Sequence, residues 1–499
     1  MANTNKNAIA LTQQNNTEPD LPTLDKIFAD LVLTAPHQNF PGPWMMRVEH
    51  SADAGCVYKW GMHCWEFVHS EEGRSIVANW LNEHHPGKAS SNLSKRAWEY
   101  SCLRLRVEKP APTLVSHLNI IPTLSGYLSL LDDGSIEVLK PDPLYGVDYV
   151  IEATLSHSTE NNYYQPQPVP DTSLFGQYLN ASLPNAEIRA VVQELCAQTL
   201  LPANYGIAGW FFGQGANGKG VLMEVVEAIH RQSCRLRLDH LAEKFSLESL
   251  VGASLVLVDE VKNDKFDEEI FKTLITGNGV DVDRKYDKPL RSYRSRAKWI
   301  ISSNNVPHIR DKSDGVWRRI VFIPWQVQIE EGKRIPDLDK LIIKDELHIV
   351  LDWLLMGAVR IVQRGRFLSE SEMPPIIQSQ KTIMRQDSDS VLAWIDEEGI
   401  HIAPNTWTTN DEIYKSYLDW CASAPRTPFG VEMFWKSMRN NRFPNLETKQ
   451  RRMKIGGKDV RKRQSNLSLV PPVTVAPPGA VKHLIEDLKN HDGFEQVPF

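Results

Sequence analysis

Short apolar runs alternate with helical patterns through the middle of the chain, and this alternation is typical of an α/β fold. Residues 205–212 (YGIAGWFF) form a run that is short and apolar enough for a buried strand. Residues 221–230 (VLMEVVEAIH) carry apolar side chains at the spacing of one helix face. Two further runs, 254–260 (SLVLVDE) and 297–303 (AKWIISS), have the strand pattern again. We therefore expect a buried sheet here, with a helix after its first strand.

Before this sheet the pattern changes from helical to extended and back. Residues 24–105 are rich in Trp, His and Leu and contain helical patterns, which predict an α-rich region. Residues 119–155 predict short strands joined by a DDGS turn, in which Asp132 and Asp133 form the turn rather than bind a metal. A helical pattern over 174–200 then leads into the sheet.

After the sheet the pattern is helical and then basic. Residues 391–400 and 410–422 predict two helices, and 434–463 predicts a helix followed by a basic turn or wing. The Pro-rich stretch 466–480 is typical of a linker, and residues 1–22 have the polar composition of a disordered tail.

A glycine-rich loop, GQGANGKG, joins the first strand to its helix. Strand, loop and helix in this order favour a phosphate-binding loop, because backbone N–H groups can converge on an anion at the positive end of the helix. Gly213, Gly215 and Gly218 can take backbone angles closed to other residues, and Lys219 is expected to neutralise the β- and γ-phosphates. A glycine-rich turn without a nucleotide is the alternative for a lone loop. The expected nucleotide contacts are Gly213, Gln214, Gly215, Ala216, Asn217, Gly218, Lys219, Gly220 and Val221.

The loop departs from the nucleotide-binding pattern at its end. That pattern ends in Ser or Thr, whose hydroxyl binds magnesium, whereas Gly220 stands in that place here. Either a water or a nearby carboxylate completes the magnesium shell, or nucleotide turnover is weak.

Acidic and amide side chains follow the next two predicted strands. Asp259 is expected to hold magnesium, directly or through water, and Glu260 to orient or deprotonate the attacking water. Asn304, followed by Asn305, can hydrogen-bond both the γ-phosphate and that water. Taken alone, the acids suit a solvated strand end and the amides suit a turn or helix cap. Their order after the loop favours the catalytic interpretation.

Two adjacent arginines, Arg318 and Arg319, precede a further apolar strand pattern in DGVWRRIVFIPW. An arginine at a subunit edge can reach a neighbour's nucleotide site and stabilise charge on the transferring phosphoryl group. A solvated face or an ion pair is the alternative. The sequence does not decide between the two arginines.

Composition narrows the class of protein. The 499 residues are 24% charged and 41% hydrophobic, which suits a globular protein of about three domains. No apolar stretch is long enough to cross a bilayer and the start is unlike a secretory signal, so we expect no membrane role and a cytoplasmic location, in a bacterial host. Six scattered cysteines without a CxxC pair argue against a disulfide framework and a zinc ribbon. The histidines near Cys64 also lack the regular spacing of zinc ligands.

Two basic segments contrast with the net charge of −6. Residues 281–298 contain seven Lys or Arg against three Asp, and residues 449–463 contain eight Lys or Arg against one Asp. Such segments on an acidic chain suggest binding to a phosphate backbone at defined places.

The first basic segment fits a hairpin of two strands, 281–287 and 290–298, around a turn near Lys288. In a ring its cations would line a channel for the DNA backbone, and Tyr286 would stack on a base. A solvated, charge-laced hairpin is the alternative. The expected DNA contacts of the two segments are Arg284, Lys285, Tyr286, Lys288, Arg451, Arg452, Arg461 and Arg463.

The motifs GQGANGKG, LVLVDE, RKYDKP, IISSNNVP and DGVWRRIVFIPW, in this order, resemble the superfamily 3 helicases. The closer resemblance is to the phage and plasmid primase-helicase family with its poxvirus-type members. It implies a ring, typically a hexamer, that uses ATP and Mg²⁺ to translocate 3′ to 5′ on single-stranded DNA. By the same resemblance Lys219 is the phosphate-binding lysine, Asp259 and Glu260 are the Walker B acids, Asn304 is the sensor, and Arg318 or Arg319 is the trans-acting finger.

The flanks are similar to the same family. The stretch SGYLSLLDDGSIEV resembles part of its N-terminal α/β domain, and QDSDSVLAWIDE with the later basic segment resembles its winged-helix region. The expected fold class is α/β, with an AAA+-like P-loop ATPase core between these two domains. The expected organisation is a disordered tail at 1–22, an N-terminal α/β domain at 23–195, an ATPase domain at 196–365, a helical and winged-helix DNA-binding region at 366–465, and a Pro-rich linker and tail at 466–499.

The resemblance implies a replicative DNA helicase of a mobile element such as a phage, satellite or plasmid, acting on single-stranded and forked DNA. The sequence has no primase pattern, so a separate primase is an expected partner. Host replication proteins are another, reached through an acidic tip that ends in Pro498 and Phe499. A frayed terminus is the alternative for that tip. Two other functions stay open: a defence ATPase without processive unwinding, and a DNA-binding initiator that needs ATP only for assembly.

Overall fold

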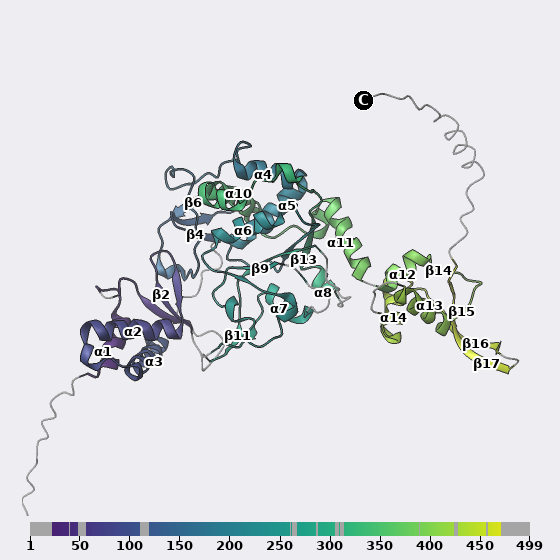
Figure 1. Cartoon of the computed structure of the whole chain (residues 1–499), viewed down its shortest axis with the longest axis horizontal. Helices are drawn as coiled ribbons and strands as arrows, with labels where there is room; N and C mark the ends of the chain where they lie inside the picture. The colour runs from purple at the N-terminus through teal and green to yellow at the C-terminus, as the bar shows by residue number, and fades with distance from the viewer. Residues whose placement is uncertain are drawn as a thin grey trace, which may run out of the picture. The chain divides into compact units, whose positions relative to one another are not determined.

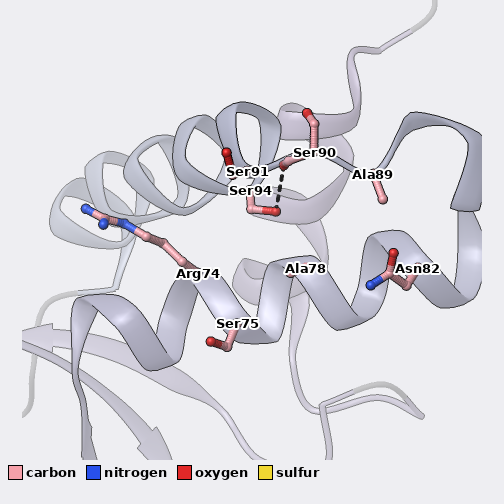
Figure 2. Close-up of a pocket in the computed structure, with 8 residues that line it drawn as sticks. All are labelled: Arg74, Ser75, Ala78, Asn82, Ala89, Ser90, Ser91 and Ser94. Atoms are coloured by element: carbon pink, nitrogen blue, oxygen red, sulfur yellow. Dashed lines mark hydrogen bonds between the residues drawn. The ribbon is translucent and has the colours of Figure 1, made fainter.

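The structure is a computed structural model in which the chain divides into two compact units, one ending at Gln380 and the other starting at Lys381. Figure 1 draws the elements of both. Most of the predicted N-terminal tail and the predicted tip at Pro498 and Phe499 lie outside the described residues. The described residues are 22–38, 40–47, 56–109, 119–259, 261, 267–285, 288–304, 309, 314–388, 390–423, 428–455 and 458–470.

A five-stranded parallel sheet is the centre of the first unit. Its strands lie in the order β13, β7, β12, β9, β8, so the strand before the glycine-rich loop has the strand before Asn304 as a neighbour. The apolar runs that predicted strands are confirmed as strands, and the fold class is mixed α/β. The sheet consists of β7 (Ala208–Phe212), β8 (Ser233–Arg235), β9 (Leu255–Asp259), β12 (Lys298–Ser303) and β13 (Ile320–Pro324).

Helices pack on this sheet through their apolar faces. The helix after the loop, α6, buries Leu222, Val225 and Ile229, which are three of the residues whose spacing predicts it. Figure 1 draws α4, α5, α6 and α10 together on one side of the strands, and α5 and α6 both contact α10. The helices of this unit from the sheet region onward are α4 (Leu174–Ser182), α5 (Ala186–Ala197), α6 (Lys219–Ile229), α7 (Glu268–Ile275), α8 (Asp314–Trp317), α9 (Leu338–Asp345), α10 (Leu347–Arg364) and α11 (Pro375–Ser388), the last of which contains the division between the units.

The residues before the sheet form two parts. The first has its own core, which includes Phe28, Val77 and Trp98. Its elements are α1 (Leu24–Thr34), β1 (Trp44–Arg47), β2 (Cys56–Trp60), β3 (Trp65–Val68), α2 (Ser70–His84) and α3 (Ser91–Glu108). The second part is an antiparallel meander of β4 (Asn119–Thr123), β5 (Gly126–Leu130) and β6 (Ile136–Leu139). In its turn the Asp133 carboxylate accepts a hydrogen bond from the Ser135 N–H at 2.8 Å, as predicted for a turn former.

One hydrophobic core crosses the expected domain boundary at 195. Leu128 of the meander belongs to the same buried cluster as Leu222 of α6 and Leu257 of β9. Buried Glu194 of α5 accepts hydrogen bonds from Arg360 of α10 at 2.9 Å, so α5 is also tied to a helix that follows the sheet. The meander and the parallel sheet therefore form one compact unit, which extends to Gln380 rather than ending at 365.

The second unit has a small aromatic core and a long hairpin. Trp394, Tyr417 and Phe434 are buried in that core, one from each helix. Leu467 is also fully buried, so the fold continues past the start of the predicted linker at 466. The predicted basic turn or wing is a two-stranded hairpin of β16 and β17. The elements are α12 (Ser390–Glu398), β14 (His401–Ile402), β15 (Thr408–Thr409), α13 (Asn410–Ala422), α14 (Val431–Ser437), β16 (Thr448–Ile455), β17 (Lys458–Ser465) and β18 (Leu467–Ser468).

The hairpin predicted over 281–298 is shorter than expected. β10 (Val280–Val282) pairs with β11 (Leu290–Tyr293), so the second strand ends well before Lys298. Lys298 begins the central strand β12, is 4% exposed and donates a hydrogen bond to the Leu201 carbonyl at 2.6 Å. Burial lowers the pKa of Lys298 to about 7. This lysine belongs to the core and not to the basic hairpin. In the sequence it counts toward the basic segment, but it is the first residue of the buried strand β12.

The described residues contain neither a membrane-spanning helix nor a cluster of metal-binding side chains. No helix there is both long and apolar enough to cross a bilayer. No group of three or more His, Cys, Asp or Glu side chains there has the arrangement of a metal site. The six cysteines all lie among the described residues, and none of them forms a disulfide.

Candidate nucleotide-binding site

The carboxyl ends of three neighbouring strands meet at one edge of the parallel sheet. Ser302 of β12 lies opposite Phe211 of β7 on one side and opposite Asp259 of β9 on the other. Neighbouring strands are about 4.8 Å apart, so the backbone of Asp259 is about 10 Å from the end of β7, where the loop begins. Asn304 follows β12 directly. The glycine-rich loop, Asp259 and Asn304 are therefore at the same edge.

Only some of the loop glycines are required by geometry. Gly218 has a φ of +91°, and a Cβ there would lie 2.2 Å from a side-chain oxygen of α4. Gly213 has no positive φ, but a Cβ there would lie 2.2 Å from the carbonyl oxygen of Trp325. Gly215 has neither constraint, and the left-handed conformation is taken by Ala216 at a φ of +60°. Of the three glycines, only Gly218 uses a backbone angle closed to other residues, whereas close packing rather than φ excludes a side chain at Gly213.

Lys219 is the first residue of α6 and points back into the loop. Its Nζ donates hydrogen bonds to the Gly213 carbonyl at 2.7 Å, the Gln214 carbonyl at 3.1 Å and Asn217 Oδ1 at 3.2 Å. The residue is 5% exposed, and burial lowers the pKa of its ammonium group. The loop oxygens use all three ammonium protons, so the positive charge is held inside the loop.

Long-range contacts that the sequence did not indicate hold the loop in shape. Trp325, directly after β13, donates from Nε1 to the Asn217 carbonyl at 2.8 Å. The hydroxyl of Tyr178 in α4 donates to the Gly218 carbonyl at 2.8 Å. Ser303 of β12 accepts a hydrogen bond from the Gly213 N–H at 3.4 Å through its carbonyl. Elements on three sides therefore fix the loop, and no local sequence pattern carries that information.

Asp259 is paired with an arginine that the sequence analysis did not single out. Arg235 Nη1 donates to Asp259 Oδ2 at 2.6 Å, and Arg235 Nη2 donates to Glu224 Oε1 at 2.6 Å. Arg235 Nε donates to Glu227 Oε2 at 3.1 Å. Burial raises the pKa of the Asp259 carboxyl above its ordinary value, and the Arg235 charge acts in the opposite direction. Arg235 ends the short strand β8, which was not predicted, and its place within the alternating stretch CRLRL was the available signal.

The remaining predicted residues at this edge are described in part. Asn304 is exposed at the end of β12. The residue before it, Ser303, accepts a hydrogen bond from Trp210 Nε1 at 2.8 Å through its hydroxyl, which ties this strand end to β7. Glu260 and Asn305 lie outside the described residues, as does Tyr286 of the first basic segment.

Arg318 and Arg319 are not at this edge of the sheet. They precede β13, which runs parallel to β7 with Ile320 opposite Ala208. The 5 residues of β13 span about 16 Å at about 3.3 Å per residue, so the arginines are a strand length away from the loop edge. Arg319 is half-buried and donates through Nη1 to the Gly315 carbonyl, whereas Arg318 is exposed. Within one chain, the structure does not bring these arginines to Lys219.

In the first basic segment the hairpin itself uses several of its cations. Arg284 donates to the Lys288 carbonyl at 2.9 and 2.7 Å, which closes the turn. Arg291 pairs with Asp281 across the two strands at 2.6 Å. The side chains of Lys285 and Lys288 are exposed. Because they are exposed, these two lysines stay candidates for contact with DNA in this segment.

Arg296, in the same segment, is part of a bridge to the N-terminal part of the unit. It forms an ion pair with Asp148, and its guanidinium lies 4.3 Å from the centre of the Tyr149 ring. Arg47 of β1 pairs with the same Asp148 carboxylate at 2.6 Å. Two arginines on one carboxylate join β1, the loop before α4 and the segment after β11, so Arg296 has a structural role.

The hairpin of β16 and β17 presents two different faces. Residues directly opposite each other share a face, and so do residues two apart on one strand. Arg452 and its partner Arg461 therefore lie on the same face as Gln450 and its partner Arg463. All four are exposed. In the part of the chain that the structure describes, the guanidinium groups of these three arginines form no hydrogen bond or ion pair with another residue.

The other face of this hairpin carries Arg451. Its guanidinium lies 4.3 Å from the centre of the Trp407 ring, and Lys449 Nζ lies 5.1 Å from the same ring. Lys462, opposite Arg451, pairs with Asp411 at 2.6 Å. Of the four arginines predicted to contact DNA here, three therefore share an open face, and Arg451 packs on an aromatic ring.

Comparison with known proteins gives one family match and several similar structures. Residues 211–319 match the model of a family of unknown function, DUF5906. That range begins in β7 and ends at Arg319, so it contains the loop, Asp259, Asn304 and both arginines.

Similar solved structures include two of the NrS-1 C terminal region. The A form apo structure of the NrS-1 C terminal region is 13% identical at a TM-score of 0.46, over 87% of this chain and 98% of that chain. Another apo structure of the NrS-1 C terminal region is 13% identical at a TM-score of 0.43, over 87% of this chain and 97% of that chain.

Proposed function

We propose that this chain is an ATP- and magnesium-dependent DNA helicase of a mobile genetic element such as a phage, satellite or plasmid. The observation that carries the proposal is the meeting of the Lys219 loop, Asp259 and Asn304 at one edge of a parallel sheet. A lysine, a carboxylate and an amide at such an edge are the groups that phosphoryl transfer from a nucleotide to water requires.

The loop fits the phosphates of ATP in three respects. It ends at the amino terminus of the 11-residue helix α6, whose dipole favours negative charge. The Lys219 ammonium group lies among loop oxygens, where it can exchange them for phosphate oxygens. A Cβ added at Gly215 or Gly220 would meet no atom within 4 Å, so the loop leaves room at both positions.

The acids at this edge fit magnesium rather than a metal held by protein side chains alone. Magnesium is usually bound through one or two carboxylates together with nucleotide phosphates, and Asp259 is such a carboxylate. When bound, the magnesium ion would neutralise charge that develops on the phosphates. In this arrangement Lys219 contacts the β- and γ-phosphates, Asn304 orients the γ-phosphate and the attacking water, and Glu260 takes the proton of that water.

The arginine pair supports assembly into a ring, for which a hexamer is expected. Arg318 is exposed and a strand length away from the loop edge of its own chain, so it is suited to act on the nucleotide of a neighbouring copy. Arg319 is the weaker candidate because its guanidinium binds the Gly315 carbonyl. Movement would be 3′ to 5′ on single-stranded DNA that passes Lys285 and Lys288.

The second unit is proposed as the winged-helix region that contacts forked or duplex DNA. The support is the open face of the β16–β17 hairpin with Arg452, Arg461 and Arg463. Arg452 and Arg461 are like charges directly opposite each other, an arrangement that costs stability unless an anion lies between or beside them. Phosphates of DNA are such anions. Priming would be the task of a separate primase or of host replication proteins.

The decisive experiment compares ATP hydrolysis and strand displacement in Lys219→Ala and in the matched control Lys333→Ala, whose lysine is exposed and pairs with Glu330. Lys219→Ala is expected to lower DNA-stimulated ATP hydrolysis by about 100-fold or more and to abolish displacement, since it removes a charge aimed at the transferring group. Lys333→Ala should match the wild type in both assays. Wild-type activity in Lys219→Ala would rule the proposal out.

Gly220 favours a second candidate function, an ATP-regulated initiator or a defence ATPase without processive unwinding. The loop lacks the hydroxyl that usually binds magnesium, which suits slow turnover. ATP hydrolysis without strand displacement would favour the defence ATPase, and DNA binding without either activity would favour the initiator. Gly220→Ser sharpens the choice, because the added hydroxyl meets no steric obstacle. An increase in turnover would show that the missing ligand limits the rate.

A further inference from the structure

Arg235 connects the candidate magnesium ligand to the helix that follows the loop. It is the last residue of β8, the edge strand of the sheet, and lies opposite Leu257 of β9. Leu257 and Asp259 are two residues apart on one strand, so their side chains point to the same face of the sheet. On this face the guanidinium binds Asp259 as well as Glu224 of α6. Arg235 therefore fixes the position of Asp259 relative to the helix that carries Lys219 and Gly220.

The two oxygens of the Asp259 carboxylate are not equivalent. Oδ2 accepts the hydrogen bond from Arg235 Nη1 at 2.6 Å. Oδ1 accepts no hydrogen bond from any residue in the described part of the chain. A carboxylate held by one oxygen in this way keeps the other oxygen in a defined direction, ready to bind a cation.

The charges around Arg235 give it a second effect on Asp259. Three carboxylates, those of Glu224, Glu227 and Asp259, surround one guanidinium. Without that guanidinium, the three negative charges would repel one another and the side chains would separate or take up protons. Arg235 thus keeps Asp259 in place beside α6.

We propose that Arg235 is a positioning residue of the nucleotide site, which holds Oδ2 of Asp259 so that Oδ1 remains available to the divalent cation bound with the nucleotide. This inference rests on the proposed function. The positioning of Asp259 matters more with this loop than with one that ends in Ser or Thr, because Gly220 supplies no hydroxyl as a second ligand of the cation. The affinity for the cation then depends on how well Asp259 is held.

The test measures the Mg²⁺ concentration that gives half-maximal binding of a fluorescent ATP analogue, and separately half-maximal ATP hydrolysis, in the full chain. Arg235→Ala is expected to raise both concentrations by about 10- to 100-fold, the usual cost of losing a group that orients a metal ligand. Arg235→Lys should recover part of the loss, since it keeps the charge without the forked geometry.

The matched control is Arg237→Ala, two residues further along the chain. Arg237 pairs with Asp239 at 2.7 Å, and its side chain is 47% exposed against 43% for Arg235. This control should leave the Mg²⁺ requirement within about 2-fold of the wild type, because Arg237 pairs with Asp239 and not with Asp259. Thermal melting of all variants separates loss of folding from loss of positioning.

The outcomes are distinct. A wild-type chain that binds no nucleotide in the presence of Mg²⁺ refutes the proposed function itself. A wild type that binds nucleotide, with Arg235→Ala and Arg235→Lys both folded and unchanged in their Mg²⁺ requirement, refutes only the positioning role. A lower Mg²⁺ requirement in Arg235→Ala would also refute it, because the guanidinium would then compete with the cation.

Discussion

The two basic segments look alike in the sequence but use their charges differently. In residues 281–298 Arg291 and Arg296 pair with carboxylates, and Lys298 is buried in the central strand. In the β16–β17 hairpin, Arg452, Arg461 and Arg463 share one exposed face. Several cations of the first segment therefore stabilise the fold through ion pairs or lie in the core, whereas three arginines of the second segment are exposed on one face. A count of Lys and Arg along the chain does not separate the two cases.

The largest expected effect is on the open face of the second hairpin. The triple variant Arg452→Glu, Arg461→Glu and Arg463→Glu should weaken binding to a DNA fork by about 100-fold or more at about 0.1 M salt, because each arginine is expected to contact one phosphate. The slope of log Kd against log salt should also fall by about 3. Fluorescence anisotropy with labelled forks at several salt concentrations measures both quantities.

The control for that variant changes the net charge equally without touching the hairpin. Arg237→Glu, Lys333→Glu and Lys340→Glu alter three exposed residues that pair within the first unit. If this control weakens DNA binding as much as the hairpin variant, the open face has no special role.

An intermediate effect on stability is expected at Lys298. Its folded-state pKa is about 7, whereas a lysine in the unfolded chain titrates near 10.4. Between these values the unfolded chain binds more protons, so the free energy of unfolding should rise with pH above about 7, by up to about 1.4 kcal/mol per pH unit. Lys298→Met should lack this contribution, which urea unfolding at pH 7, 8 and 9 can measure.

The control here is Lys288→Met, since Lys288 is exposed and its replacement removes no buried charge. DNA affinity should be the same in Lys298→Met and in the wild type, because the buried ammonium group faces the Leu201 carbonyl. A loss of DNA affinity in Lys298→Met at unchanged stability would show that this lysine contributes to DNA binding.

The smallest effect is expected at the turn of the first hairpin. Lys285→Ala combined with Lys288→Ala should weaken single-stranded DNA binding by roughly 3- to 10-fold and leave fork binding through the second unit within about 2-fold. Arg291→Ala is the matched control on the same hairpin, because its guanidinium pairs with Asp281. A loss as large as that of the triple variant would mean that both segments are open to DNA, and the contrast between them would fail.

Strong local patterns predicted the centre of the fold and the order of the site. The apolar runs before Gly213 and up to Asp259 and Ser303 became three adjacent parallel strands, because buried strands of this kind need continuous apolar residues. Once the strands are parallel and neighbouring, their carboxyl ends must meet. The position of Lys219, Asp259 and Asn304 at one edge follows from the sequence in this way.

Contacts between residues far apart in the chain were not predictable from the same patterns. Arg235 reaches Asp259 from a strand of only 3 residues, which is too short to produce a clear periodic signal. Trp325 fixes the loop from the carboxyl end of β13, although the apolar residues around it in the sequence do not distinguish it from other strand ends. The hydrophobic pattern marks burial but not which elements share a core, so it does not show that Leu128 of the meander and Leu222 of α6 lie in one buried cluster.

The parallel pairing of β13 with β7 has a consequence for stoichiometry. The arginine pair and the glycine-rich loop lie at opposite ends of these adjacent strands. In the proposed ring, a site with both the loop and an arginine would therefore form only at a junction between two copies. A mixture of Lys219→Ala and Arg318→Ala chains, each inactive alone, should then regain part of the hydrolysis, because some junctions combine an intact loop with an intact arginine. Dilution should lower the hydrolysis per molecule for the same reason.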